Sequence, residues 1–152
     1  MRTRAGIILI EDNKVALIER HRAGLHYFVF PGGGVYEGES PEQAAIRETM
    51  EELGLQVLIK QKVAEVHLGQ KSRQVYFLVE QTGGEFGSGT GEEFTDSDPH
   101  NPEEGVYFPI WMPINELPQH DKVFPVDVAK LVLKSQKDGW PTEPIVVFEV
   151  PK

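Results

Sequence analysis

The stretch from Ser40 to Gly54, SPEQAAIRETMEELG, constrains the fold more than any other part of the chain. Ser40 can cap the start of a helix, Pro41 suits the first helical position, and Gln43 completes a capping-box pattern. Gly54 suits the left-handed residue that follows a helix. Because both ends carry their own signals, the stretch predicts a single helix with defined limits.

The acidic residues of this helix lie where its backbone tolerates them least. Glu48, Glu51 and Glu52 fall near its carboxyl end, where the negative end of the helix dipole repels them. Glu48 and Glu52 also stack four residues apart as like charges, which costs about 0.2–0.5 kcal/mol in an isolated helix. Arg47 can pair with Glu51 and offset part of this cost. A sequence that breaks a local rule in this way often marks a functional site.

Helical spacing also predicts which face of the helix is buried. Ile46, Met50 and Leu53 recur at i, i+4 and i+7, so the expected core-facing stripe is apolar. The three glutamates would then lie on the opposite side. On spacing alone, a solvated acidic face is the favoured interpretation of this cluster.

The remaining segments predict a mixed α/β fold, with no internal repeat and no linker, and residues 1–152 are expected to form one domain. A β-hairpin is expected over 4–20, around the turn residues Asp12 and Asn13. A second helix is expected over 125–137, where apolar residues show helical spacing. Further strands are expected at 27–30, 55–59, 63–68, 74–80, 106–114 and 145–150.

Composition and charge exclude several classes of function. The chain has no cysteine, so it can form no disulfide, thiolate nucleophile or cysteine zinc site. Its formal charge is −9, and no lysine or arginine occurs between Arg73 and Lys122, which argues against a partner that is a nucleic-acid polymer. The longest aliphatic run, 7–10, is far too short to span a membrane. We therefore expect a cytoplasmic protein without a membrane partner.

A glycine-rich loop directly precedes the helix. The segment FPGGGVYEGES carries four glycines and adds Glu39 to the acidic residues of the helix. Glycines let a backbone approach a ligand closely, although a tight turn is the simpler reason for them. Together, the loop, the helix and the clustered carboxylates indicate a Mg²⁺ or Mn²⁺ site presented beside a phosphate.

At these residues the sequence resembles the Nudix (MutT-like) hydrolases. Their signature is a glycine, five residues, a glutamate, seven residues, and then Arg-Glu-aliphatic-x-Glu-Glu-x-Gly-aliphatic. Its fixed positions are matched by Gly33, Glu39, Arg47, Glu48, Glu51, Glu52, Gly54 and Leu55. Two positions depart from the usual pattern: Thr49 replaces an aliphatic residue, and Tyr36 stands where many members have another glutamate. The segments FVFPGGG and WMPINELP also resemble the family's usual surroundings.

The resemblance implies an α+β fold, an α/β/α sandwich around a mixed β-sheet. It also implies hydrolysis of a nucleoside diphosphate linked to another group, with Mg²⁺ or Mn²⁺ as cofactor. Glu51, Glu52 and the carbonyl of Gly32 would be metal ligands, and Glu48 would be either a ligand or the base for the attacking water. Arg47 would orient the glutamates through its fork of donors.

Further roles are expected outside this helix. Arg20 and Arg22 are candidates to reach a substrate phosphate, although a solvated strand end is about equally favoured, and Gly33 and Gly34 are candidates to contact substrate. Related enzymes often supply one more glutamate from the loop before a W-x-P segment. Glu104, with Glu103 beside it, is the candidate for this ligand or base. The acid-rich segment 83–105 is alternatively a soluble insertion.

The substrate is predicted only by exclusion. Members selective for ADP-ribose tend to carry a proline around 70–72, and this chain has none there. The favoured substrate is therefore a small nucleotide, a nucleoside triphosphate in unmodified or oxidised form, cleaved to monophosphate and pyrophosphate. The alternatives are a catalytically silent domain that binds a nucleotide and regulates another process, and an acidic domain that binds divalent ions alone. The oligomeric state stays open.

Overall fold

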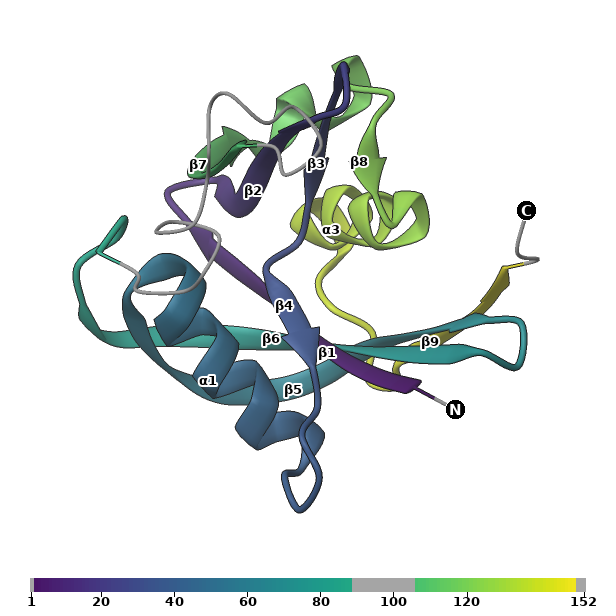
Figure 1. The fold of residues 1–152 in the computed structure, drawn as a ribbon. Coiled ribbons are helices and arrows are strands. Elements are labelled where there is room, and N and C mark those ends of the chain that lie inside the picture. Colours follow the sequence, from purple (N-terminus) through teal and green to yellow (C-terminus); the bar gives the residue numbers. More distant parts are fainter. Residues whose placement is uncertain (1, 89–105, 150–152) are drawn as a thin grey trace.

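The computed structural model describes residues 2–88 and 106–149 (Figure 1). Within these residues the helical elements are α1 (Pro41–Leu53), α3 (Val126–Asp138) and the 3₁₀ helix η1 (Ile114–Gln119). The strands are β1 (Arg2–Glu11), β2 (Lys14–Arg22), β3 (Leu25–Val29), β4 (Gly32–Gly34), β5 (Leu55–Leu68), β6 (Ser72–Gly84), β7 (Val106–Pro113), β8 (Val123–Phe124) and β9 (Ile145–Glu149).

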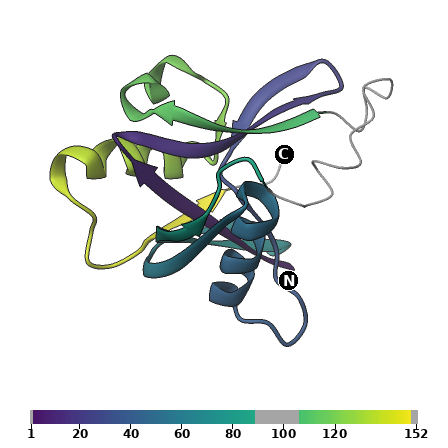
Figure 2. The ribbon, with the colours of Figure 1, turned by 90° about the vertical axis from the view of Figure 1, so that its left-hand side faces the viewer.

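The strands form one mixed sheet in the order β8-β3-β2-β1-β6-β5-β9, with β4 paired to β1 and β7 paired to β2. β1 joins two halves of this sheet. Its larger part pairs in parallel with β6, and its last residues pair with β2. Figure 2 shows the two halves diverging from β1, with β2, β3 and β7 on one side and β5 and β6 on the other.

Two apolar cores lie on opposite faces of the sheet, each covered by one helix (Figure 1). Successive residues of a strand point to opposite faces, so Ile7 and Leu9 pack under α1 whereas Ile8 packs under α3. The predicted α+β sandwich around a mixed sheet is thus confirmed. None of the described helices is long and apolar enough to cross a membrane.

The predicted first hairpin is also confirmed. Asp12 and Asn13 join β1 to β2 with φ angles of 50° and 62°. Positive φ at both central residues defines the tight turn whose twist matches that of two paired strands. β1 and β2 pair with each other only next to the turn, at Ile10–Val15 and Glu11–Lys14. Beyond these pairs, β3 and β7 pair with β2 and continue it to Arg22.

Other boundaries differ from the sequence prediction. The strands expected at 55–59 and 63–68 are one strand, β5, whose register against β6 shifts at three places. Such bulges interrupt the alternation of buried and exposed residues, which is why the pattern appeared as two short strands. The short strand β4 was interpreted as loop because it consists of glycines, and β8 has only two residues.

Helix α1 begins and ends as predicted. The hydroxyl of Ser40 accepts a hydrogen bond from the backbone N–H of Gln43 at 3.1 Å, and the Gln43 side chain accepts one from the N–H of Ser40 at 2.8 Å. Gly54 follows the helix with φ of 77°, and its N–H bonds to the carbonyl of Met50 at 3.0 Å. Local signals alone therefore determined these limits.

The predicted orientation of α1 is wrong. Ile46 and Met50 are 40% and 39% exposed, while Glu48 and Glu52 are only 9% and 6% exposed. The face turned inward consists of Ala44, Ala45, Glu48, Thr49, Glu52 and Leu53. The small alanines bring the helix close to the sheet, and the carboxylates meet polar partners that offset the cost of burying them.

Thr49, which departs from the usual family pattern, is accommodated in this inward face. It is fully buried, and its hydroxyl donates to the carbonyl of Ala45 at 2.7 Å. Because the hydroxyl has this partner, the polar side chain sits in the core without an unsatisfied group.

Candidate active site

Strand β4 and helix α1 approach each other through glycine. β4 pairs with β1, so that Gly32 lies opposite Gly6 and Gly33 opposite Ala5. A Cβ added at Gly32 would overlap the carbonyl of Ala5, and one added at Gly33 would overlap the carboxylate of Glu48. The glycines thus allow close contact with β1 on one side and leave room for an acidic side chain of α1 on the other.

Arg47 is the centre of the hydrogen-bond network between the loop and the helix. Its Nε and Nη2 donate to the two carboxylate oxygens of Glu39 at 2.9 and 3.0 Å. Its Nη1 donates to Glu48 at 2.8 Å and to Glu51 at 3.2 Å. Nη2 also donates to the carbonyl of Gly34 at 2.9 Å. One side chain therefore positions three glutamates and the glycine strand together.

The hydrogen bond between Arg47 and Glu39 keeps both of these side chains ionised. The hydrogen bond from Arg47 lowers the pKa of Glu39, against the opposing effect of burial. The same bond, followed by that to Glu48, raises the pKa of Arg47 further. A single guanidinium thus faces several carboxylates, and the excess negative charge suits a divalent cation.

Tyr36 contributes a contact that the sequence did not reveal. Its ring lies under the guanidinium of Arg47, 3.8 Å from ring centroid to Cζ. Tyr36 occupies the position where many related sequences carry a glutamate, so here an aromatic face replaces a carboxylate beside the arginine.

The residues predicted as metal ligands meet at the junction of α1 and β4. Glu52 accepts a hydrogen bond from the N–H of Gly32 at 3.3 Å, and Glu48 is buried next to Gly33. Glu51 lies at the rim, with its side chain 39% exposed. Carboxylate oxygens are the donors that Mg²⁺ and Mn²⁺ prefer, so these residues fit such an ion.

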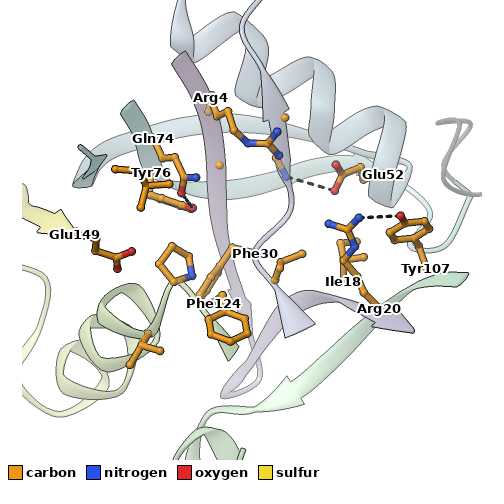
Figure 3. A pocket seen from close by; sticks show the side chains of 18 residues that line it. Arg4, Ile18, Arg20, Phe30, Glu52, Gln74, Tyr76, Tyr107, Phe124 and Glu149 are labelled. Atoms are coloured by element: carbon orange, nitrogen blue, oxygen red, sulfur yellow. Dashed lines mark hydrogen bonds between the residues drawn. The ribbon is translucent and has the colours of Figure 1, made fainter. Parts of the chain in front are cut away.

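A pocket of about 380 Å³ opens between the two halves of the sheet, next to Glu52 (Figure 3). Glu52, Gly32 and Gly33 line one part of it. The arginines that line it come from both halves, Arg4 from β1 and Arg20 from β2. Its other lining residues include Ile18, Val29, Phe30, Gln74, Tyr76, Tyr107, Phe124 and Glu149.

Arg20 is held at the pocket by aromatic side chains. Its Nη2 donates to the hydroxyl of Tyr107 at 2.8 Å, as drawn in Figure 3, and its guanidinium lies 4.3 Å from the centroid of that ring. Its Nε is buried and has no acceptor among the described residues. Arg22 lies at the exposed end of β2, outside the residues that line the pocket.

Tyr76 and Gln74 form the polar part of the opposite wall. The Tyr76 hydroxyl donates to Gln74 Oε1 at 2.7 Å (Figure 3), and burial raises the pKa of Tyr76, which keeps this hydroxyl protonated. The Tyr76 ring packs against β1 at Gly6, which has no side chain. A Cβ at this position would overlap the ring. Phe30 meets Tyr76 edge to face, with ring centroids 6.2 Å apart.

The sequence identified only part of this pocket. Arg20, Gly33 and Glu52 were expected at the site, and the structure brings them to it. Arg4, Gln74 and Phe124 were missed, because the parallel pairing of β1 with β6 and the position of β8 leave no local pattern. Glu103 and Glu104 lie outside the described residues, so the extra glutamate stays a prediction.

Comparisons with known proteins show what the chain is similar to. Residues 1–131 match the family model of the NUDIX domain. The RNA pyrophosphohydrolase of Acinetobacter baylyi is 32% identical over 136 residues, which cover 76% of this chain and 78% of that protein. The RNA pyrophosphohydrolase of Psychromonas ingrahamii is 48% identical over 54 residues, 36% of this chain and only 29% of that protein.

A solved structure shows the same fold. The crystal structure of a NUDIX hydrolase from Nitrosomonas europaea superposes with a TM-score of 0.73, covering 97% of this chain and 79% of that one. Its sequence identity is 23%, so the likeness extends to the arrangement of helices and strands and not to individual side chains.

Proposed function

Because this chain belongs to the Nudix hydrolase family, we propose that it is a metal-dependent pyrophosphohydrolase. One observation carries the proposal: Glu52 belongs both to the buried acidic face of α1 and to the wall of the pocket. A cation held by the acidic face would therefore lie beside a ligand in the pocket. Mg²⁺ or Mn²⁺ fits the oxygen donors available there.

Each residue of the acidic face has a proposed role. Glu51 and Glu52, with the carbonyl of Gly32, would hold the cation, and Glu48 would be either a further ligand or the base for the attacking water. The bound ion would neutralise the charge of the diphosphate and activate water. Arg47 would keep Glu48 and Glu51 in place through the hydrogen bonds described above.

The pocket suits one nucleotide. Its volume of about 380 Å³ falls within the range of small-molecule sites. Arg4 and Arg20 would contact the phosphates, and the buried Nε of Arg20 supplies a donor that an anionic oxygen would satisfy. The aromatic side chains of Phe30, Tyr76 and Phe124 offer an apolar surface to the nucleoside.

The proposed reaction is conversion of a nucleoside triphosphate, unmodified or oxidised, to the monophosphate and pyrophosphate. A second candidate is the triphosphate at the 5′ end of an RNA, favoured by the two relatives named RNA pyrophosphohydrolase. The reacting linkage is the same in both. The net charge of −9 favours the free nucleotide over a nucleic-acid polymer.

A panel of substrates tests this proposal. Purified protein is incubated with nucleoside triphosphates, their oxidised forms, 5′-triphosphorylated RNA and ADP-ribose, in Mg²⁺, in Mn²⁺ and in EDTA. We expect pyrophosphate release from a triphosphate with either metal and none in EDTA. Binding of a nucleotide without any turnover would instead support the silent regulatory domain. Metal binding without nucleotide binding would support the domain that binds ions alone.

Glu104 keeps its proposed role as an additional ligand or base. Comparing Glu104→Gln with Glu103→Gln on the identified substrate tests it, because only the residue with a chemical role should show a large fall in kcat. Full kcat in both variants would remove this glutamate from the mechanism.

A further inference from the structure

A second group of metal-binding side chains lies on the β2–β3 hairpin. His21 Nε2 and His26 Nε2 are 3.1 and 2.7 Å from the same oxygen of Glu19, Oε2. One ligand atom from each of the three residues lies within 4.8 Å of the others. Two imidazole nitrogens and one carboxylate oxygen therefore converge on a single point.

The pairing of the strands places these residues together. His21 of β2 is directly opposite His26 of β3, and Glu19 is two residues from His21, so all three point to the same face of the hairpin. Arg20, between Glu19 and His21, points to the other face and into the pocket (Figure 3). The cluster is thus separated from the candidate active site by the sheet itself.

Aromatic rings support the two imidazoles. The rings of His21 and His26 stack with centroids 4.2 Å apart and an interplanar angle of 10°. His26 also packs against Phe28, with centroids 5.2 Å apart, and His21 meets the edge of Phe108 at 6.3 Å. These contacts restrict the rings while both Nε2 atoms face Glu19, which lowers the entropy lost when a ligand orders them.

We propose that Glu19, His21 and His26 bind a divalent transition-metal ion of the Zn²⁺ or Ni²⁺ type. Imidazole nitrogen favours such ions over Mg²⁺, which prefers oxygen. Zn²⁺ binds imidazole at about 2.0–2.1 Å, so tetrahedral ligands lie about 3.3 Å apart. The Nε2–Oε2 separations of 3.1 and 2.7 Å would widen toward this value, and the two stacked rings would tilt so that both nitrogen lone pairs point to the ion. Three protein ligands leave the fourth position open to solvent or to another ligand.

Hydrogen bonding within the hairpin is the simpler explanation of this cluster. Yet His21 and His26 have side chains 46% and 51% exposed, so water is available to both. Burial therefore does not force either ring to bond to Glu19. Convergence of both on one oxygen brings three ligand atoms close enough to share one ion, which would take the place of the protons in the hydrogen bonds.

Zinc titration of the protein without an affinity tag tests the site. Excess Mg²⁺ is present throughout to occupy the carboxylates of α1, and bound Zn²⁺ is measured by calorimetry and by competition with a chromophoric chelator. We expect the wild type to bind one Zn²⁺ under these conditions. His21→Asn and His26→Asn should each weaken this binding at least about tenfold, because each removes one of three ligands.

His67→Asn is the matched control. His67 also bonds through Nε2 to a glutamate, Glu65, at 2.9 Å, and stacks on an aromatic ring, but it brings no second histidine. This variant should bind Zn²⁺ as the wild type does. Circular dichroism of each variant without Zn²⁺ verifies that it is folded. No Zn²⁺ binding by the wild type, or equal binding by folded His26→Asn, would overturn the proposal.

Discussion

Helices α1 and α3 have the same length, 13 residues, but bury different kinds of side chain. α3 turns an apolar stripe inward, with Val128, Leu131 and Val132 at its centre. α1 turns Glu48 and Glu52 inward and leaves Met50 at the surface. α3 also has a basic residue in its last turn, as the helix dipole favours, whereas α1 has none.

This difference separates a helix that stabilises the fold from one that builds a site. The buried residues of α3 contribute through the apolar surface they remove from water. Those of α1 include charges that need Arg47 and the backbone of β4 as partners, so stability alone gives no reason to choose them. Changes in the two helices should therefore affect different measurements.

The largest expected effect is on activity and comes from α1. We expect Glu52→Gln to lower kcat by at least about 10²-fold, since even the partners of a metal ligand contribute 10–100-fold. The fold should be retained, because glutamine has the same shape and removes a repelled charge. Pyrophosphate release and a thermal melt without metal provide the two readouts. Turnover at the wild-type rate would contradict the assigned role.

The next effect is on stability and comes from α3. Leu131→Ala should lower the free energy of unfolding by about 2–5 kcal/mol, the usual range for a buried leucine. Met50→Ala in α1 is the matched control, and because Met50 is partly exposed it should cost much less. Urea denaturation measures both. An equal loss for the two variants would restore the orientation of α1 that spacing predicted.

Metal should stabilise the protein through α1. An ion that binds only the folded state adds about 2.7 kcal/mol at a hundredfold excess over its dissociation constant. We expect Mg²⁺ or Mn²⁺ to raise the melting temperature of the wild type and of Leu131→Ala, and to have little effect on Glu52→Gln. Calorimetric scans with and without metal measure the shift. The absence of a shift in the wild type at saturating metal would count against the site.

The smallest effect concerns acid stability. Because the pKa of Glu39 is lower in the folded state than its ordinary value of 4.5, its contribution to stability is present above that pH and is lost as the pH falls through the folded pKa. The free energy of unfolding should decline as the pH falls below about 4.5, and Glu39→Gln should make this decline less steep. The difference should be less than about 1 kcal/mol, as expected for a partly exposed ion pair. Urea unfolding as a function of pH measures this decline.

Glu65 provides the comparison for that measurement. Burial would raise its pKa, but hydrogen bonds from His67, Lys62 and Arg73 lower it to about 2. Glu65→Gln should thus flatten a different part of the same decline. The effects of the two variants should add, because Glu39 and Glu65 share no hydrogen-bond partner among the described residues. An unchanged decline in Glu39→Gln would mean that its pairing with Arg47 contributes nothing to stability.

Sequence reasoning was most accurate where one segment holds all the interactions involved. The turn at Asp12 and Asn13 and both ends of α1 depend on residues within a few positions of one another, so their patterns could be recognised. The motif from Gly33 to Leu55 is likewise continuous, and it predicted the residues that gather around Arg47. The apolar stripe of α3 was also predicted, because its inward-facing positions are mainly apolar and recur with helical spacing.

Sequence reasoning was least accurate where distant segments meet. Arg4 and Gln74 line one pocket only because β1 and β6 pair in parallel, with Arg4 opposite Gln74 in the register. The three residues of the β2–β3 cluster come together because the two strands pair, with His21 opposite His26. Neither arrangement has a local pattern from which it could be predicted.

The sequence by itself determined where α1 starts and stops and the family to which the chain belongs. Only the tertiary structure decided which face of α1 is buried. Helical spacing predicts that Ile46 and Met50 face the core. In the structure Glu48 and Glu52 face inward instead, because the glycines of β4 leave room for carboxylates and Arg47 donates a hydrogen bond to Glu48. Burial of a charge depends on partners that lie elsewhere in the chain, so no helical pattern could show it.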